Sequence, residues 1–395
     1  MDASDRAALM DLTPDRPIRI LHVMEATIGG TKRHLLDLVA SLDRRLVEVE
    51  IASPRVRSDP HGDTSFIEDM ARLGVVIHEI PMVRAIRPTT DARTIWALAR
   101  LIRRRRHDIV HTHSTKAGVL GRIAAVLNPN AQAVHTPHGF YFLNFDSPFI
   151  RTALRWQEQV LGWISSRVIV LSGGERDIAA NLIPDKKIRL IPNTFDSFEP
   201  LERAQARRRL GLPPRVPVVC TTARFTAQKA PFDVADTFAA IHHAHPQTLF
   251  VWMNDGELRD PVEARLQALG VKHATLLPGY LSDARALLTA ADVYLHLARW
   301  EGAPYSVMEA MTAGVPVVAA RAVGTTDLID NGRTGVLVNQ GDIRAAAAAA
   351  VHLLTHPDEA RTLTTNARRA VAIHHNSASM ARATEHVYRE LIAEQ

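Results

Sequence analysis

The chain has 395 residues, of which 46% are hydrophobic and 23% are charged, so it is long enough for about two domains with buried cores. This composition excludes a disordered tail, a collagen and a disulfide-stapled miniprotein. Cys220 is the single cysteine, so no disulfide can form within the chain. The first residues lack the basic start and apolar stretch of a signal peptide, and no apolar run approaches the ~20 residues of a membrane span. We therefore expect a cytoplasmic protein.

The formal net charge of +5 comes entirely from residues 1–198. Basic residues are densest between Arg84 and Arg122, where they are interleaved with apolar side chains. This pattern predicts a basic amphipathic helix over roughly residues 90–106, of the kind that binds an anionic membrane surface. An ordinary solvated helix with cations at its C-terminal end would give the same pattern. Nucleic acid is not an expected partner, because no aromatic stacking platform accompanies the charge.

Short apolar, β-branched runs alternate with segments of helical periodicity along the whole chain. Such alternation indicates parallel sheets that are covered by helices on both faces. The predicted strands are residues 18–24, 47–52, 75–80, 109–112, 134–136, 168–171, 188–191, 216–222, 248–253, 274–277, 293–297 and 315–319. The clearest predicted helices are residues 32–42, 115–127, 151–163 and 232–243.

A turn-rich stretch at residues 193–200, followed by an Arg-rich helix, predicts a domain boundary. The sequence therefore predicts two doubly wound, Rossmann-like α/β domains, residues 1–198 and 199–376, that face a central cleft. Residues 377–395 are expected to form a helix that packs back on the first domain.

Ligands in open α/β sheets bind beyond the carboxyl ends of the strands. Gly29 and Gly30 follow the first strand, where they permit a close backbone approach before a helix whose free N–H groups suit an anion. A Gly-Gly turn is equally common for structural reasons. It is not the Gly-x-Gly-x-x-Gly fingerprint of a dinucleotide dehydrogenase.

Four charged residues in the second half fit a nucleotide diphosphate. Arg224 and Lys229 leave the strand at residues 216–222, and two cations there would clamp a diphosphate unless the loop is simply solvated. Glu301 lies in a Gly/Pro loop and Glu309 in the helix that follows it. Such carboxylates can accept hydrogen bonds from the hydroxyl groups of the ribose and of the sugar. The N-terminus of the helix would face a phosphate.

Histidine is abundant, at 19 residues, which raises the question of a metal. The pairs have neither the Cys partners nor the spacing of a zinc site, and the chain has no Asp-x-Asp motif for a metal-bound phosphate, so we expect no metal. His111 and His113 end a strand, where they either line a substrate site or have a structural role.

Glu301 and Glu309, with Arg224 and Lys229 upstream, resemble the site of the retaining family-4 glycosyltransferases of the two-domain GT-B fold. The resemblance extends over nearly the whole chain. The segments VHTHSTKAGVLGR and VHTPHGFYF look like the bacterial capsule, exopolysaccharide and glycan-assembly branch. The turn at residues 193–196 is similar to the family's Asn-Gly-x-Asp turn.

The resemblance implies a role for each matching residue. Residues 1–198 would bind the acceptor and residues 199–376 the nucleotide sugar. The implied catalytic residues are His138, Glu301, Arg224 and Lys229. The implied donor-binding residues are Gly29, Gly30, Arg224, Lys229, Glu301, Ala303, Pro304, Tyr305, Ser306 and Glu309, and the implied acceptor-binding residues are His111, His113 and Lys116.

The implied activity is retaining transfer of a hexose or N-acetylhexosamine from UDP to a lipid-linked or glycan acceptor, without metal or other cofactor. The expected acceptor is a polyprenyl-diphosphate-linked glycan, handled by a protein that is peripheral on the inner face of the cytoplasmic membrane. The alternatives are a transferase with a soluble acceptor, a UDP-sugar epimerase on the same fold, and a non-enzymatic adaptor. One departure from the family pattern is Ala230, where members commonly have glycine after the lysine.

Overall fold

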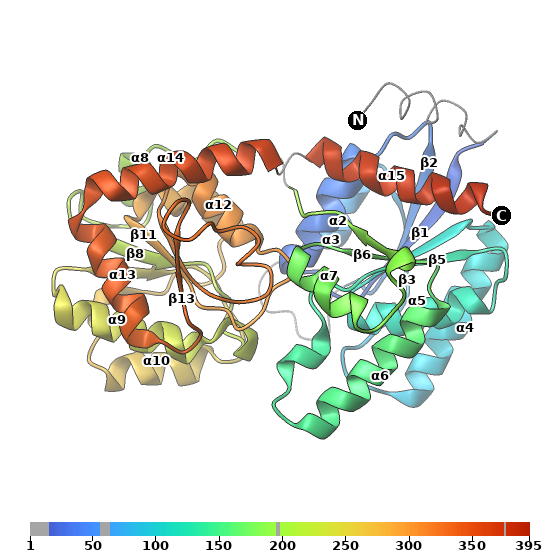
Figure 1. The fold of residues 1–395 in the computed structure, drawn as a ribbon, viewed down its shortest axis with the longest axis horizontal. Coiled ribbons are helices and arrows are strands. Elements are labelled where there is room, and N and C mark those ends of the chain that lie inside the picture. Colours follow the sequence, from blue (N-terminus) through green and yellow to red (C-terminus); the bar gives the residue numbers. More distant parts are fainter. Residues whose placement is uncertain (1–15, 56–63, 195–197, 375–376) are drawn as a thin grey trace. The chain divides into compact units, whose positions relative to one another are not determined.

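The computed structural model describes residues 16–55, 64–194, 198–374 and 377–395, which form two compact units (Figure 1). Unit 1 contains residues 16–55, 64–194 and 377–395, and unit 2 contains residues 198–374. The division lies close to the boundary expected at residues 198 and 199. In the described residues no helix combines the length and the apolar character that crossing a bilayer requires.

Unit 1 is built on a seven-stranded parallel sheet in the order β3-β2-β1-β4-β5-β6-β7. Each of the seven strands coincides with a predicted one. The five inner strands are largely buried runs, whereas the edge strands β3 and β7 are more exposed. The strands are β1 (Ile18–Met24), β2 (Val47–Ser53), β3 (Val76–Glu79), β4 (Ile109–His113), β5 (Gln132–Thr136), β6 (Arg167–Val170) and β7 (Ile188–Leu190).

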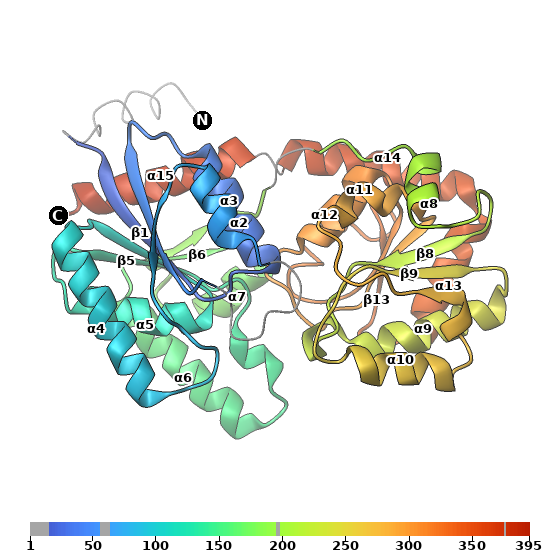
Figure 2. The ribbon, with the colours of Figure 1, turned by 180° about the vertical axis from the view of Figure 1, so that it is seen from behind.

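Helices cover both faces of this sheet (Figures 1 and 2). One layer places α4, α5 and α6 side by side, and on the other face the C-terminal helix α15 packs against α2. Glu390 of α15 forms ion pairs with Arg167 and Arg189 at 2.9 and 2.5 Å, so this helix is part of unit 1. The helices are α2 (Gly29–Ser41), α3 (Phe66–Arg72), α4 (Pro88–Arg105), α5 (Thr115–Val126), η1 (Tyr141–Asn144), α6 (Pro148–Ile164), α7 (Gly173–Ala180), η2 (Asp185–Lys187) and α15 (Ser377–Ala393).

Unit 2 has a six-stranded parallel sheet in the order β10-β9-β8-β11-β12-β13. Five of these strands were predicted, and β13 was missed. The strands are β8 (Val218–Thr221), β9 (Leu249–Trp252), β10 (Thr275–Leu276), β11 (Val293–His296), β12 (Val317–Ala320) and β13 (Val336–Val338). The helices are α8 (Arg203–Arg209), η3 (Ala227–Lys229), α9 (Pro231–Ala244), α10 (Arg259–Ala268), η4 (Lys272–Ala274), α11 (Ala284–Leu287), η5 (Leu288–Ala290), α12 (Tyr305–Ala313), α13 (Ile343–Thr355) and α14 (Pro357–His374).

Each sheet reverses its strand order at one place, between β1 and β4 in unit 1 and between β8 and β11 in unit 2. At such a topological switch point the loops that follow the two central strands diverge to opposite faces and leave room for a ligand. The expectation of two doubly wound α/β units is therefore confirmed.

Two glycines of α5 let this helix approach the sheet closely. A Cβ on Gly121 would lie 2.4 Å from Cγ2 of Thr112 on β4, and one on Gly118 would lie 2.5 Å from the ring of His135 on β5. Both distances are far below van der Waals contact, so the sequence Lys-Ala-Gly-Val-Leu-Gly-Arg has glycine where helix and sheet meet. Arg122 continues this contact, since its buried guanidinium pairs with Glu158 of α6 at 3.0 Å.

We expect Gly121→Ala to destabilise the protein by about 1–3 kcal/mol, because the new methyl group overpacks the interface with Thr112. Thr112→Ser removes the clashing Cγ2 and keeps the hydroxyl, so the double variant should recover much of the loss. Urea unfolding of the two single variants and the double variant measures the coupling. Additive losses would contradict the assigned contact.

Candidate functional site

An ion pair joins the loops that follow the two central strands of unit 2. Lys229 ends the short helix η3 after β8, and Glu301 lies in the loop between β11 and α12. Their ammonium and carboxylate groups form a salt bridge that is largely buried. Nε2 of His296 lies 3.2 Å from the same carboxylate oxygen, and the Gln228 amide lies 3.4 Å from the other. The structure thus brings together two of the predicted catalytic residues at the switch point.

The Glu301 carboxylate is ionised at neutral pH. Burial by itself would raise its pKa, but the charge of Lys229 and the contact with His296 outweigh burial and lower this pKa to about 2. Burial lowers the pKa of His296, although its contact with Glu301 opposes that shift. The site therefore holds one negative and one positive charge, beside a neutral imidazole.

The backbone of the Glu301 loop is fixed by the chain after β12. The Glu301 amide donates to the Val323 carbonyl at 3.0 Å. Gly324 has a φ of +84°, and a Cβ there would lie 2.5 Å from the Gly302 carbonyl oxygen, so only glycine allows this approach. These contacts hold the loop rigidly in front of α12.

The predicted donor-binding segment lies at the N-terminus of α12. Pro304 is its N-cap, with no side-chain capping bond, and Ala303 and Tyr305 are buried beside it. Ser306 hydrogen-bonds the buried hydroxyl of Tyr294, which also contacts Thr222 Oγ1 at 2.7 Å. The amide groups of the first turn therefore lie beside the end of β8. Their dipoles favour an anion.

Arg224 and Glu309 are both half-buried. Arg224 lies in the loop after β8, between the strand and η3, and Glu309 is the fifth residue of α12. Arg224 therefore lies in the same β8–α9 connection as Lys229. Glu309 lies in α12, the helix that follows the loop of Glu301. Their roles in binding a donor stay predictions from the resemblance.

Ala230 adopts a left-handed backbone conformation, with φ 48° and ψ 55°. This region favours glycine, which gives a physical reason for the glycine that resembling proteins commonly have here. The strained turn separates Lys229 from α9, which begins at the next residue, Pro231. The chain thus holds its lysine at a point of stored backbone strain.

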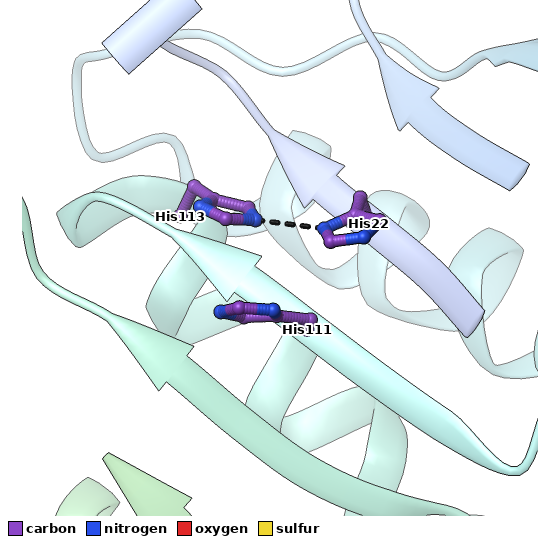
Figure 3. A group of neighbouring side chains, drawn as sticks. All are labelled: His22, His111 and His113. Carbon is purple, nitrogen blue, oxygen red and sulfur yellow. Dashed lines mark hydrogen bonds between the residues drawn. The ribbon is translucent and has the colours of Figure 1, made fainter. Parts of the chain in front are cut away.

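Histidine side chains fill the switch point of unit 1. His22 on β1 is the register partner of His111 on β4, and His113 follows two residues later on the same face of the sheet (Figure 3). His138 lies just beyond β5, and His34 lies on α2. His22 and His34 were missed by the sequence analysis, although pairing the two predicted strands in parallel would have aligned His22 with His111.

Three of these imidazoles form a hydrogen-bonded chain. Nδ1 of His22 lies 2.9 Å from Nε2 of His113, and Nδ1 of His113 lies 3.1 Å from Nε2 of His138 (Figure 3 shows the first bond). The ring centroids are 5.1 and 5.4 Å apart, so the rings meet edge to edge rather than face to face. A neutral imidazole has one N–H and one lone pair. The tautomer of His138 is therefore coupled to those of His113 and His22.

His111 and His34 tie the cluster to other elements. The two ring nitrogens of His111 contact the hydroxyl of Tyr388 on α15 at 2.6 Å and Oγ1 of Thr136 at 2.8 Å. Nδ1 of His34 lies 2.8 Å from Oδ1 of Asn193. The structure thus gives His111 a buried contact with the C-terminal helix, and its acceptor-binding role stays a prediction. Asp196, from the same predicted turn as Asn193, lies outside the described residues.

Backbone strain marks the ends of β4 and β5. Ser114 has φ 61° and ψ 175°, and His138 has φ 55°, both unusual for residues other than glycine. The strained loop after β5 is held by the buried carboxylate of Glu175, which accepts from the Gly139 amide at 2.5 Å and from the Leu171 amide at 2.8 Å. Glu175 was not singled out in the sequence, because nothing local distinguishes it from other acids in a first helical turn.

The remaining predicted residues have simple surroundings. Gly29 has a φ of +65° at the start of α2, and both Gly29 and Gly30 are exposed. Lys116 is largely buried and pairs with Asp91 of α4 at 2.7 Å. Its acceptor-binding role stays a prediction beside this structural contact.

Two groups of histidines are close enough to hold a metal ion among the described residues: His22, His111 and His113, and His34, His113 and His138. The lone pair of an imidazole nitrogen lies in the ring plane. The hydrogen bonds from His113 to His22 and to His138 use nitrogens that a metal would need. A metal would have to break the bond between His22 and His113. The geometry therefore favours a hydrogen-bonded chain, and metal independence stays a prediction.

Both units of the chain are similar to known proteins. Residues 28–197 match the model "Glycosyltransferase Family 4", and residues 202–370 match "Glycosyl transferases group 1". The chain is 30% identical over 299 residues to the UDP-Gal:alpha-D-GlcNAc-diphosphoundecaprenol alpha-1,3-galactosyltransferase of Escherichia coli, covering 73% of this chain and 76% of that protein.

Two solved structures have the same fold. Anabaena Alr3699/HepE in complex with UDP and glucose has a TM-score of 0.78 and 18% identity, over 94% of this chain and 99% of that one. Sucrose-phosphate synthase from Thermosynechococcus elongatus has a TM-score of 0.82 and 22% identity, over 96% of this chain and 100% of that one.

The buried histidines should make the stability of unit 1 depend on pH. Burial lowers the pKa of His22 to about 3 and that of His34 to about 4. Below about pH 6.5 these histidines are protonated in the unfolded chain but stay neutral in the folded one. The unfolded state therefore binds more protons, and unit 1 loses stability as the pH falls. Each such group contributes about 1.4 kcal/mol per pH unit. His34→Gln should reduce the slope of unfolding free energy against pH by that amount between about pH 6 and pH 5.

The matched control is His386→Gln, which changes an exposed histidine of α15. Urea unfolding at several pH values would measure both slopes. Equal slopes for wild type and His34→Gln would contradict the neutral, buried state assigned to His34.

The left-handed conformation of Ala230 should cost the protein stability. Ala230→Gly should stabilise the protein by about 1 kcal/mol, because glycine adopts the left-handed conformation without a Cβ penalty. Ala227→Gly, three residues earlier with an ordinary φ, should destabilise it by about 0.5–1 kcal/mol. Thermal unfolding of the two variants compares the signs. The same sign for both would contradict the strain.

Proposed function

The chain belongs to glycosyltransferase family 4, and from that premise we propose that it transfers a sugar from UDP to a polyprenyl-diphosphate-linked glycan. The observation that carries this proposal is the buried Lys229–Glu301 pair beside the N-terminus of α12. It sets a cation and a carboxylate beside the positive end of the α12 dipole, at the carboxyl edge of the parallel sheet. The similarity to a galactosyltransferase named for UDP-Gal and a diphosphoundecaprenol acceptor supports both substrates.

In the proposed mechanism the cations act on the leaving group. Arg224 and Lys229 neutralise the diphosphate, together with the N-terminal amides of α12, and so stabilise the negative charge that develops as the sugar departs. Lys229 exchanges part of its contact with Glu301 for the phosphate oxygens. The freed carboxylate of Glu301 accepts hydrogen bonds from the sugar hydroxyls, and Glu309 accepts from the ribose.

The proposed reaction retains the anomeric configuration. The acceptor attacks from the face that the diphosphate leaves, and a departing phosphate oxygen takes the acceptor's proton. Rate enhancement then comes from positioning and from charge stabilisation. No pair of carboxylates acting as nucleophile and acid is required. The sugar, a hexose or an N-acetylhexosamine, and the role of His138 beside it are parts of the same proposal.

The same arrangement supports the proposal that transfer needs no metal. The positive charge that many phosphoryl and glycosyl transfers obtain from a divalent cation is supplied here by Arg224 and Lys229. We therefore expect transfer to persist in the presence of EDTA.

The test is transfer of radiolabel from UDP-, GDP- and ADP-sugars to GlcNAc-diphosphate-polyprenol and to a water-soluble analogue of it. We expect transfer from a UDP-sugar into butanol-extractable lipid. Glu301→Gln and Arg224→Gln should each reduce kcat/KM by roughly 10²–10³-fold, because the first removes a charged acceptor for the sugar hydroxyls and the second removes a cation that stabilises the leaving diphosphate. Arg344→Gln, an exposed residue of α13, is the matched control for loss of a cation.

Each contrary outcome points to a different alternative. Label only in water-soluble product would favour a soluble acceptor. Solvent deuterium in recovered UDP-sugar without transfer would favour an epimerase. NMR of the new linkage would decide between retention and inversion, and inversion would contradict the proposed mechanism.

A further inference from the structure

Helix α6 of unit 1 presents an exposed apolar stripe. Phe149, Trp156, Val160 and Trp163 are 82%, 67%, 42% and 60% exposed. Their spacing of seven, four and three residues places them on one side of the helix. The opposite side, with Leu161 and Gly162, faces the protein. Large apolar side chains exposed in a continuous stripe mark a surface that contacts something else.

No acid is exposed on α6, and the stripe itself carries no charged side chain. Arg151 and Arg155 are exposed but lie on the other side of the helix from the stripe. The single acid of α6, Glu158, is buried and pairs with Arg122 at 3.0 Å. The ion pair therefore removes the one negative charge that would oppose an anionic surface.

The same layer of helices adds further cations. Helix α4 lies on the other side of α5 from α6 (Figures 1 and 2), and it carries exposed Arg93, Arg100, Arg103 and Arg104. Its own apolar side chains, Leu98 and Ile102, are buried against the sheet, and Trp96 is exposed. The sequence analysis expected this helix to be the membrane-binding one. The structure shows that its apolar side is occupied, so α4 supplies charge while α6 supplies the apolar contact.

We propose that α6 lies flat in the interface of an anionic phospholipid membrane, with Phe149, Trp156, Val160 and Trp163 in the headgroup–acyl boundary and the arginines of α4 on the lipid phosphates. Tryptophan partitions into this region because its ring is amphipathic, and each nearby Arg contributes about 1 kcal/mol at an anionic surface. The proposal deepens the proposed function and rests on it in one respect, since a polyprenyl-linked acceptor is found at such a surface.

The experiment measures binding of the full chain to vesicles without donor or acceptor. We expect binding to vesicles that contain phosphatidylglycerol, weaker binding to pure phosphatidylcholine, and weakening by salt. The double variant Trp156→Ser/Trp163→Ser should lose roughly 10- to 100-fold in vesicle affinity, from the apolar area that two indoles bury. Ile373→Ser in unit 2 changes a side chain that is 65% exposed and should bind as wild type does.

A wild type that fails to bind anionic vesicles would overturn the proposal, as would a double variant that binds them unchanged. A dimer that the double variant dissociates would also overturn it, because the stripe would then be an interface between copies. Transfer to the water-soluble acceptor analogue separates this inference from the proposed function. Loss of vesicle binding with that transfer intact concerns α6 alone, and vesicle binding without any transfer contradicts the function alone.

Discussion

The reversal of strand order in each parallel sheet is the constraint on which both candidate sites depend. Between β1 and β4, and again between β8 and β11, consecutive connections leave toward opposite faces. The loops that follow these strands therefore diverge, and the side chains at the strand ends are enclosed between those loops. Histidines occupy this position in unit 1, and the Lys229–Glu301 pair occupies it in unit 2.

The two sites differ in their electrostatics because burial acts on different residue types. In unit 2 the carboxylate of Glu301 stays charged although it is buried, since Lys229 offsets its desolvation. In unit 1 no carboxylate of the described residues raises the pKa of His111 or His113, so burial lowers it and keeps these histidines neutral. A charged pair suits a charged ligand, whereas neutral imidazoles both donate and accept hydrogen bonds and suit hydroxyl groups.

Unfavourable backbone conformations accompany these sites. Ser114 and Ala230 have positive φ values after β4 and β8, which flank the two switch points, and His138 has one after β5, the neighbour of β4. Such conformations persist only where surrounding contacts impose them. The Glu175 carboxylate supplies such contacts after β5, and the packing of Gly324 against Gly302 fixes the loop that carries Glu301. Rigid loops keep functional side chains in place before a ligand arrives.

The sequence by itself determined the alternation of strands and helices, because buried parallel strands are continuous apolar runs whose limits can be read locally. It also indicated the charged residues of unit 2, since Arg224, Lys229, Glu301 and Glu309 lie beside strand ends or a helix start. Only the tertiary structure aligned His22 with His111, buried His111 under Tyr388, and paired Lys116 with Asp91. It also decided that the apolar side of α4 is covered and that of α6 exposed. Amphipathic periodicity gives a helix an apolar side, but which neighbour covers that side depends on contacts between residues far apart in the chain.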